Sequence, residues 1–272
     1  MASASAPSPP LYPLYRERWD FSMAMLTVVF VVYAAGLLGA LLTMRSLSDR
    51  LGRRRVLFSA LLLAALSMAI FWAADGLGAL LIARFVQGVA SGTAMSGLAA
   101  GLLDMLPAVR AHAGARVTAI ATSAGMALGA GGMGLLLESS SRPDRYAFPL
   151  LAALFVCLAA AMLFLPEVST PLPFGWAALR PRIGIDPAAR STFLATVPTT
   201  VAGWAATGLF LALVPSLVRA VVHVEIPAIG GLSITCLYLA VTAGGLWAGR
   251  LRLATVTLLG SVLMGLGALA WA

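Results

Sequence analysis

Long apolar runs alternate with short polar segments along the whole chain. Eight of these runs have close to 20 residues or more, which is about the number that crosses a hydrocarbon core of roughly 30 Å as an α-helix. None of them alternates polar and apolar residues as the strand of a membrane barrel does. The pattern therefore predicts eight membrane-spanning helices, at 22–44, 54–74, 77–104, 115–137, 146–165, 192–216, 227–249 and 253–271.

Two segments interrupt this series and divide the chain. Residues 1–21 are polar and rich in proline, and they lack the basic start and continuous apolar core of a signal peptide. Residues 166–191 carry five prolines and three arginines and separate five predicted helices from three. We therefore expect a lead-in at 1–21, a helical half with five spans at 22–165, an interdomain loop at 166–191 and a partial second half with three spans at 192–272.

The composition excludes several classes of protein. Hydrophobic residues make up 61% of the chain and charged residues only 10%, whereas soluble domains have about 45–50% and about 25%. This excludes a soluble globular enzyme, a disordered chain and a disulfide scaffold. All 18 basic residues are arginines in short clusters between apolar runs, giving a net charge of +8. Because nucleic-acid binders place such residues on a solvated face, we expect a lipid bilayer and no nucleic acid as partner.

The arginine distribution predicts an orientation, because basic residues accumulate in cytoplasmic loops. Twelve arginines lie in the segments after the first, third, fifth and seventh predicted helices, and five lie on the other side. The former segments are therefore predicted to be cytoplasmic, in a multi-pass protein of the cell (inner) membrane. An external amino terminus without a signal peptide suggests a further helix upstream.

The connection between the first two predicted helices has the strongest motif, Leu47-Ser-Asp-Arg-Leu-Gly-Arg-Arg-Arg55. It predicts a tight turn at Gly52, with one carboxylate in a basic cluster that can cap helix ends. Basic composition alone would also fit a simple membrane anchor. The order of residues resembles the signature loop of the major facilitator superfamily, G-x-L-x-D-R-x-G-R-R, with Arg45 in place of the leading glycine. The residues that match in register, and that the resemblance assigns to gating, include Asp49, Arg50, Gly52, Arg53 and Arg54.

The third predicted helix carries a second match, Arg84-Phe-Val-Gln-Gly-Val-Ala-Ser-Gly92, which resembles the R-x-x-Q-G motif of the family's fourth helix. Its spacing places Arg84, Gln87, Gly88 and Ser91 on one helix face. An arginine in a span costs about 2.5–3.5 kcal/mol on insertion scales, so it faces a cavity or a partner, unless it extends along the helix to the interface. The resemblance implies that Arg84, Gln87 and Ser91 serve coupling or the substrate cavity, and that Gly88 and Gly92 serve helix packing.

Two further features agree with the family. Gly125 and Gly129 form a G-x-x-x-G pair that lets helices approach closely. Their segment resembles the antiporter motif of the family's fifth helix, with Ala130 where that motif has proline. Asp104 closes the third predicted helix, where the resemblance implies a carboxylate that pairs with the signature loop.

The resemblance covers nearly the whole chain and implies an all-α polytopic membrane protein of about eight transmembrane helices in an incomplete major-facilitator arrangement. By the resemblance, residues 1–21 hold the remnant of a first helix whose bulk is absent, and the last three helices are absent as well. The resemblance also implies a secondary active transporter of small molecules by alternating access, proton-coupled and exporter-like, that is, an efflux protein. The alternative is a truncated fragment without transport activity.

An intramembrane enzyme is the third reading. No serine lies in a G-x-S-G nucleophile motif, and His112 and His223 both fall in predicted loops. The ten acidic residues are scattered rather than clustered as a metal site requires, and Cys157 and Cys236 lie in apolar runs as packing residues do. We therefore expect no enzyme activity, no metal and no cofactor.

Overall fold

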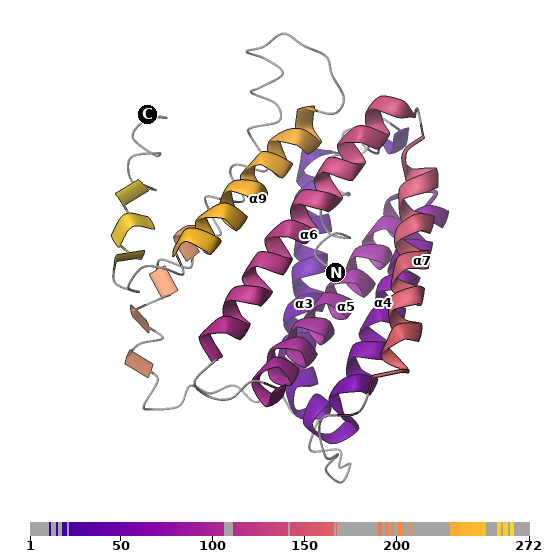
Figure 1. Ribbon diagram of the computed structural model, residues 1–272. Coiled ribbons are helices and arrows are strands. Elements are labelled where there is room, and N and C mark those ends of the chain that lie inside the picture. Colours follow the sequence, from indigo (N-terminus) through magenta and orange to yellow (C-terminus); the bar gives the residue numbers. More distant parts are fainter. Residues whose placement is uncertain are drawn as a thin grey trace.

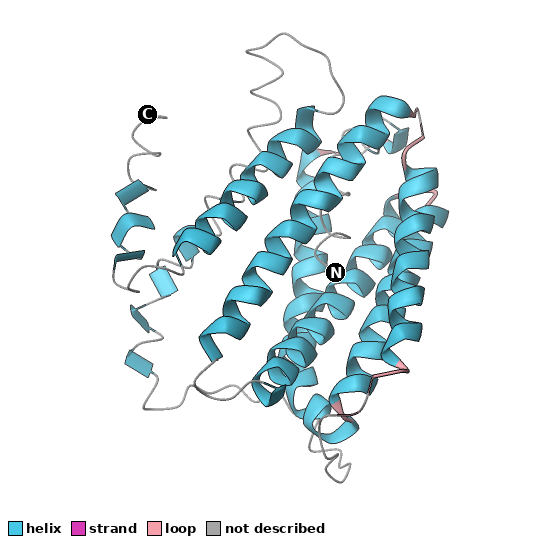
Figure 2. Ribbon diagram, viewed as in Figure 1, coloured by secondary structure: helices cyan, strands magenta, loops and turns pink. Residues whose placement is uncertain are grey.

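A computed structural model shows a chain built from helices (Figure 1). Within the part of the chain that it describes, every regular element is a helix and no strand occurs (Figure 2). The described residues are 11, 15, 18–20, 22–105, 111–140, 142–165, 167, 190–191, 194–195, 197–198, 201–203, 207, 229–248, 255–256, 258–260 and 262–263.

Six long helices lie in this part of the chain, and they confirm a helix at six of the eight predicted positions. They are α3 (Met23–Leu51), α4 (Arg53–Ala73), α5 (Leu77–Met105), α6 (Ala111–Ser139), α7 (Asp144–Met162) and α9 (Ile229–Ala248). The first five are long and apolar enough to cross a membrane, and α9 contains a shorter apolar stretch, Gly231–Trp247. The predicted spans 192–216 and 253–271 fall mostly outside the described residues, and those described within them are helical.

The connection between α3 and α4 is shorter than predicted. The sequence indicated an apolar helix that ends at residue 44 and a loop that begins at Arg45, but α3 continues to Leu51 and α4 begins at Arg53. Hydropathy detects where the chain leaves the apolar core, whereas a helix can continue beyond it with arginines in contact with water. Only Gly52 connects the two helices, with a φ of 93° that L side chains rarely adopt.

The described helices form two packed groups. In one group α3 lies along α5, and α4 packs against both α5 and α7. In the other α6 packs along α9, and α6 lies between α9 and α7 (Figure 1). Helices α5 and α6 touch at only a few positions. The first group therefore forms a continuous bundle, and α6 is associated mainly with α9.

The contact between α3 and α5 brings two backbones together. A methyl group on Gly36 would lie 2.6 Å from the carbonyl oxygen of Phe85, and one on Gly88 would overlap the carbonyl oxygen of Tyr33. The next turn repeats this arrangement, with Gly92 against the carbonyl oxygen of Leu37. Lipid tails are as apolar as the helices, so close van der Waals contact of this kind drives helix association in a membrane. Both Gly88 and Gly92, predicted as packing residues, lie in this contact.

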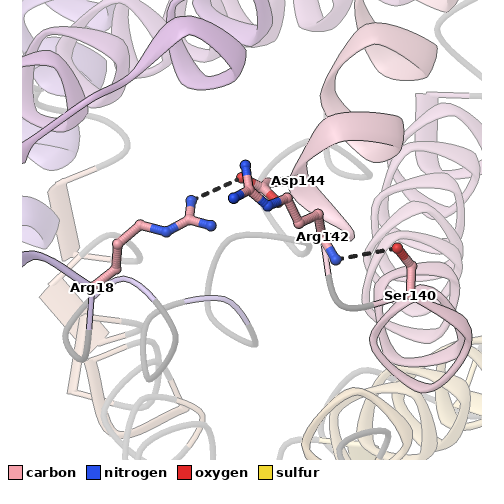
Figure 3. Close-up of polar contacts among 4 residues, drawn as sticks. All are labelled: Arg18, Ser140, Arg142 and Asp144. Atoms are coloured by element: carbon pink, nitrogen blue, oxygen red, sulfur yellow. Dashed lines mark hydrogen bonds and ion pairs between the residues drawn. The ribbon is translucent and has the colours of Figure 1, made fainter.

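The largest apolar core includes part of the amino-terminal lead-in. Leu11 and Tyr15 are buried in it together with side chains from α4, α5 and α7, and the Tyr15 ring stacks on that of Trp19 with centroids 4.7 Å apart. Near this segment, Arg18 Nη1 donates to Asp144 Oδ2 at 3.4 Å, at the first turn of α7 (Figure 3). An ion pair as exposed as this one contributes about 0–1 kcal/mol, so burial of Leu11 and Tyr15 is the stronger attachment.

The α3–α5 contact predicts different effects for two neighbouring glycines of α3. Gly36→Ala is expected to cost about 1–3 kcal/mol, because the added methyl group meets backbone atoms of α5 that cannot rotate away. A methyl group on Gly39 meets no atom within 4 Å, so Gly39→Ala is expected to leave stability unchanged or slightly higher. Thermal unfolding of the detergent-purified variants measures the difference. Equal Tm values for the two variants would contradict this packing.

Candidate functional site

The most unusual side chain of the described bundle is Arg84, which is buried on α5. Only 3% of it is exposed, although arginine is almost never fully buried without partners. Its Nη1 donates to Oε1 of Gln87 at 2.8 Å, one turn later on the same helix. Two aromatic rings lie within cation–π distance of the guanidinium carbon: the Phe71 centroid at 5.4 Å and the Tyr33 centroid at 5.9 Å.

The polar residues predicted to share one face of this helix all lie on its buried side. Gln87 is 2% exposed and Ser91 is 5% exposed, and Gly88 packs on α3 between them. Arg84 is enclosed by protein rather than exposed, because its guanidinium lies against rings of α3 and α4. The sequence places these polar residues on one face, and the packing of α5 against α3 and α4 leaves all three side chains buried.

Tyr33 and Phe71 are the members of the site that the sequence did not reveal. Each is a single aromatic residue in a long apolar run, and such residues occur at any packing position. The signal that identifies them is spatial, namely the distance from each ring to the guanidinium of Arg84.

This arrangement fixes the chemistry that Arg84 can perform. An arginine side chain stays protonated in proteins, so it cannot itself release a proton. Its positive charge is instead permanent, in a bundle of low dielectric where charge interactions are stronger than in water. Such a charge attracts an anion and favours the ionised form of any carboxyl group that approaches it.

The second predicted site is the turn at Gly52, which the structure confirms as a tight connection between α3 and α4. The side chains of Asp49, Arg50 and Asp104 lie outside the described residues, so their assignment to gating stays a prediction. Arg53 and Arg54 lie at the start of α4, where their backbone amides have no partner within the helix.

Glu167 occupies this helix end. Its Oε1 accepts hydrogen bonds from the backbone N–H groups of Arg53 at 2.9 Å and of Arg54 at 3.4 Å. In return, Nη1 of Arg54 donates to the carbonyl oxygens of Leu165 at 3.0 Å and of Leu163 at 3.4 Å, just after α7 ends. A carboxylate thus lies at a helix amino terminus and a guanidinium beside a helix carboxyl terminus, and both positions complement the helix dipoles. We call these four hydrogen bonds the Glu167–Arg54 clamp.

The clamp also explains the space required at Gly52. A methyl group there would lie 2.6 Å from Oε2 of Glu167, so a side chain at this position would disturb the capping carboxylate. Sequence reasoning did not identify Glu167 as a functional residue. A usable signal exists, since an acidic residue directly follows Pro166 on the same predicted side of the membrane as the basic loop.

The third predicted feature, the glycine-rich stretch of α6, lies against α9. A methyl group on Gly231 would lie 2.7 Å from Cα of Gly134, so the two backbones meet there. Thr235 Oγ1 lies within 3.2 Å of the carbonyl oxygen of Ala127 and within 2.8 Å of that of Gly231, its own helix neighbour. The sequence assigned packing to Gly125 and Gly129, and this stays a prediction; the methyl group on Gly231 would come closest to the carbonyl oxygen of Ala130, at 2.5 Å. This contact joins chain segments on either side of the 166–191 connection.

Comparison with known proteins identifies a family whose model matches the chain. The family model described as Major Facilitator Superfamily matches residues 1–272. A search of curated proteins finds no match to the chain. Among the residues that the structure describes, no three His, Cys, Asp or Glu side chains lie where they could hold a metal ion together.

The clamp predicts a graded loss of stability at position 167. Glu167→Gln keeps an acceptor oxygen and loses the charge, whereas Glu167→Ala loses both, so Tm is expected to fall from the natural protein to Gln to Ala. The full loss is about 0.5–2 kcal/mol, the value of a helix cap. Glu138→Gln, at the exposed end of α6, is the matched control. If both changes at position 167 leave Tm at the value of this control, the clamp does not stabilise the fold.

Proposed function

The chain belongs to the major facilitator superfamily, a family of membrane transporters, and on this basis we propose that it is a proton-coupled secondary transporter that exports a small molecule across the cell (inner) membrane by alternating access. The proposal assigns the coupling site to Arg84, Gln87 and Ser91. It assigns control of the cytoplasmic end to Asp49, Arg50 and Asp104, together with the turn at Gly52.

One observation carries this assignment: Arg84 is buried in an apolar bundle. A permanent charge in a membrane-spanning helix is costly, and such residues are found where they serve ions, substrates or proton relays. Gln87 supports the role, because its hydrogen bond fixes one nitrogen of the guanidinium. Helix association alone does not require this charge, since α3 and α5 already pack through backbone contacts at glycines.

In this mechanism Arg84 supplies a fixed positive charge, and the mobile proton is carried by another group. A carboxyl group that approaches Arg84 releases its proton to water, because the nearby cation favours the ionised form, and it takes up a proton from water again when it moves away. Binding of substrate and release of a proton thereby become linked through one charge. Ser91 lies two turns further along the same buried face and offers a hydroxyl group for hydrogen bonding.

Two contacts support alternating access. Helices α6 and α9 belong to segments on opposite sides of the 166–191 connection, and they meet through close backbone approach and the hydroxyl of Thr235. The Glu167–Arg54 clamp ties the start of α4 to the end of α7. The first contact lies between the predicted halves, and the second joins α4 and the end of α7 to the first residues of the 166–191 connection, as expected if the halves move as separate bodies.

Transport is tested with the purified chain in proteoliposomes that contain a trapped pH-sensitive dye. A panel of amphipathic cations, anions and neutral compounds is added, and proton movement across the membrane is recorded. We expect Arg84→Ala to reduce substrate-dependent proton flux at least tenfold, because the fixed charge is lost. Arg84→Lys retains a charge but not the planar guanidinium and is expected to be intermediate.

The matched control for Arg84 is Arg55→Ala, because Arg55 is exposed at the start of α4. It is expected to transport as the natural protein does. Undiminished flux in Arg84→Ala would refute the coupling role, and the absence of flux from the natural protein with every compound would refute the proposed transport.

A separate test concerns the signature loop. Asp49→Asn changes only the charge of a residue that the resemblance assigns to gating, so we expect reduced flux with an unchanged Tm. Both properties are measured on the same proteoliposome preparation and its parent detergent sample. Unchanged flux would mean that Asp49 contributes to topology and not to gating.

A further inference from the structure

The guanidinium of Arg84 lies between rings from two other helices, Phe71 of α4 and Tyr33 of α3. We propose that these two rings are positioning residues, which hold Arg84 in place through cation–π contacts. The proposal builds on the transport role of Arg84 proposed above. It adds two residues that act on transport through Arg84 without contacting the substrate.

A second ring holds Phe71 in place. Its ring stacks on that of Phe148 of α7, with centroids 5.0 Å apart and planes 11° from parallel. Both side chains are buried, Phe71 at 2% exposure and Phe148 at 0%. Because a buried stacked ring has little freedom to rotate, Phe71 presents a constant face toward Arg84. The Phe71 ring of α4 thus contacts both the guanidinium from α5 and the Phe148 ring from α7.

Tyr33 is fixed by the helix contact that carries it. Its carbonyl oxygen lies against Gly88, in the closest approach between α3 and α5. Gly88 follows Arg84 by about one helical turn, so the register of the two helices determines where the Tyr33 ring meets the guanidinium. Helix packing at Gly88 and ring packing at Arg84 are therefore parts of one contact.

Aromatic rings suit this task for an electrostatic reason. The negative face of a ring attracts a cation, most strongly where water is excluded. Unlike a carboxylate, however, a ring carries no net charge, so Arg84 keeps its full positive charge after the contact forms. A site held in this way combines a fixed geometry with a charge that remains available to an incoming anionic group.

The alternative is that Phe71 and Tyr33 only fill space around a long side chain. Cation–π positioning depends on the electron density of the ring face, whereas space filling depends only on the size of the ring. Replacement of ring hydrogens by fluorine weakens the negative face of phenylalanine in steps and changes its size little. Space filling predicts no trend along such a series, whereas cation–π positioning predicts a progressive loss that requires the guanidinium.

The experiment places phenylalanine with one, two or three fluorines at position 71 of the full chain, in the natural background and in Arg84→Met. Phe155 of α7, 1% exposed in the same core, receives the same series as the matched control. We expect Tm to fall stepwise at position 71, by about 2–4 °C in total. No trend is expected at Phe155, or at position 71 when Arg84 is Met.

Proton flux supplies a readout that simple packing would not change. With the panel compound that gives the largest flux, we expect a decrease of about tenfold across the series at position 71. At Tyr33, Tyr33→Phe retains the ring and is expected to retain flux, whereas Tyr33→Leu is expected to lose it.

The positioning proposal would be overturned if Tm did not change along the fluorine series at position 71, or if the same decrease in Tm occurred in Arg84→Met. A Tm trend that requires Arg84, in a chain that gives no flux with any compound, would support positioning and refute the proposed transport. The two proposals therefore fail on different measurements.

Discussion

The close backbone contact between α3 and α5 is the interaction on which the described bundle depends. In a membrane, helices gain little from burying apolar side chains against one another, because lipid offers a similar environment. Contact between backbones at Gly36, Gly88 and Gly92 provides the dense packing that association requires. The same contact determines the register of α5 against α3, and thereby the position of Arg84. One structural requirement, helix association, thus places the one charged side chain that is buried in the described bundle.

The ends of the helices follow a different principle. Near water, the unpaired amides at the start of α4 and the unpaired carbonyls after α7 need partners. Glu167 and Arg54 provide them in both directions, so charged groups stabilise the bundle where dielectric screening is high and desolvation is cheap. Inside the bundle, burying further charged groups of this kind would be expensive. There, aromatic rings and Gln87 surround Arg84 instead. Contacts of charged side chains with the backbone thus lie at the helix ends, and contacts of a charged side chain with rings and an amide lie inside the bundle.

Much of this fold could be predicted from sequence because its determinants are local. Apolar runs gave six helices to within a few residues at most ends, and the spacing of Arg84, Gln87 and Ser91 gave their common buried face. The end of α3 could not be found in this way, since hydropathy reports the membrane boundary rather than the end of a helix. Glu167, Phe71 and Tyr33 could not be assigned either. Their roles depend on contacts between residues far apart in the chain. Neither the spacing of apolar residues nor the composition of a segment encodes those contacts.

The two helix groups differ in the number of contacts that are lost when their helices move apart. Displacing α5 from its neighbours would break backbone packing on α3, the ring contacts of Arg84 and the hydrogen bond from Ser67 of α4 to the carbonyl oxygen of Ala83. Separating α9 from α6 would break the hydroxyl contact of Thr235 with Ala127 and the close approach at Gly231. Thr235 Oγ1 retains a partner on its own helix, the carbonyl oxygen of Gly231, so no hydroxyl is left unsatisfied by the separation. An unsatisfied buried hydroxyl costs about 1–3 kcal/mol, and avoiding this cost lowers the barrier to movement. Both separations would give up a close backbone approach at glycines, but separating α5 from its neighbours would also remove the ring contacts of Arg84. Fewer polar contacts therefore oppose a movement at α6–α9, where the proposed alternating access needs one.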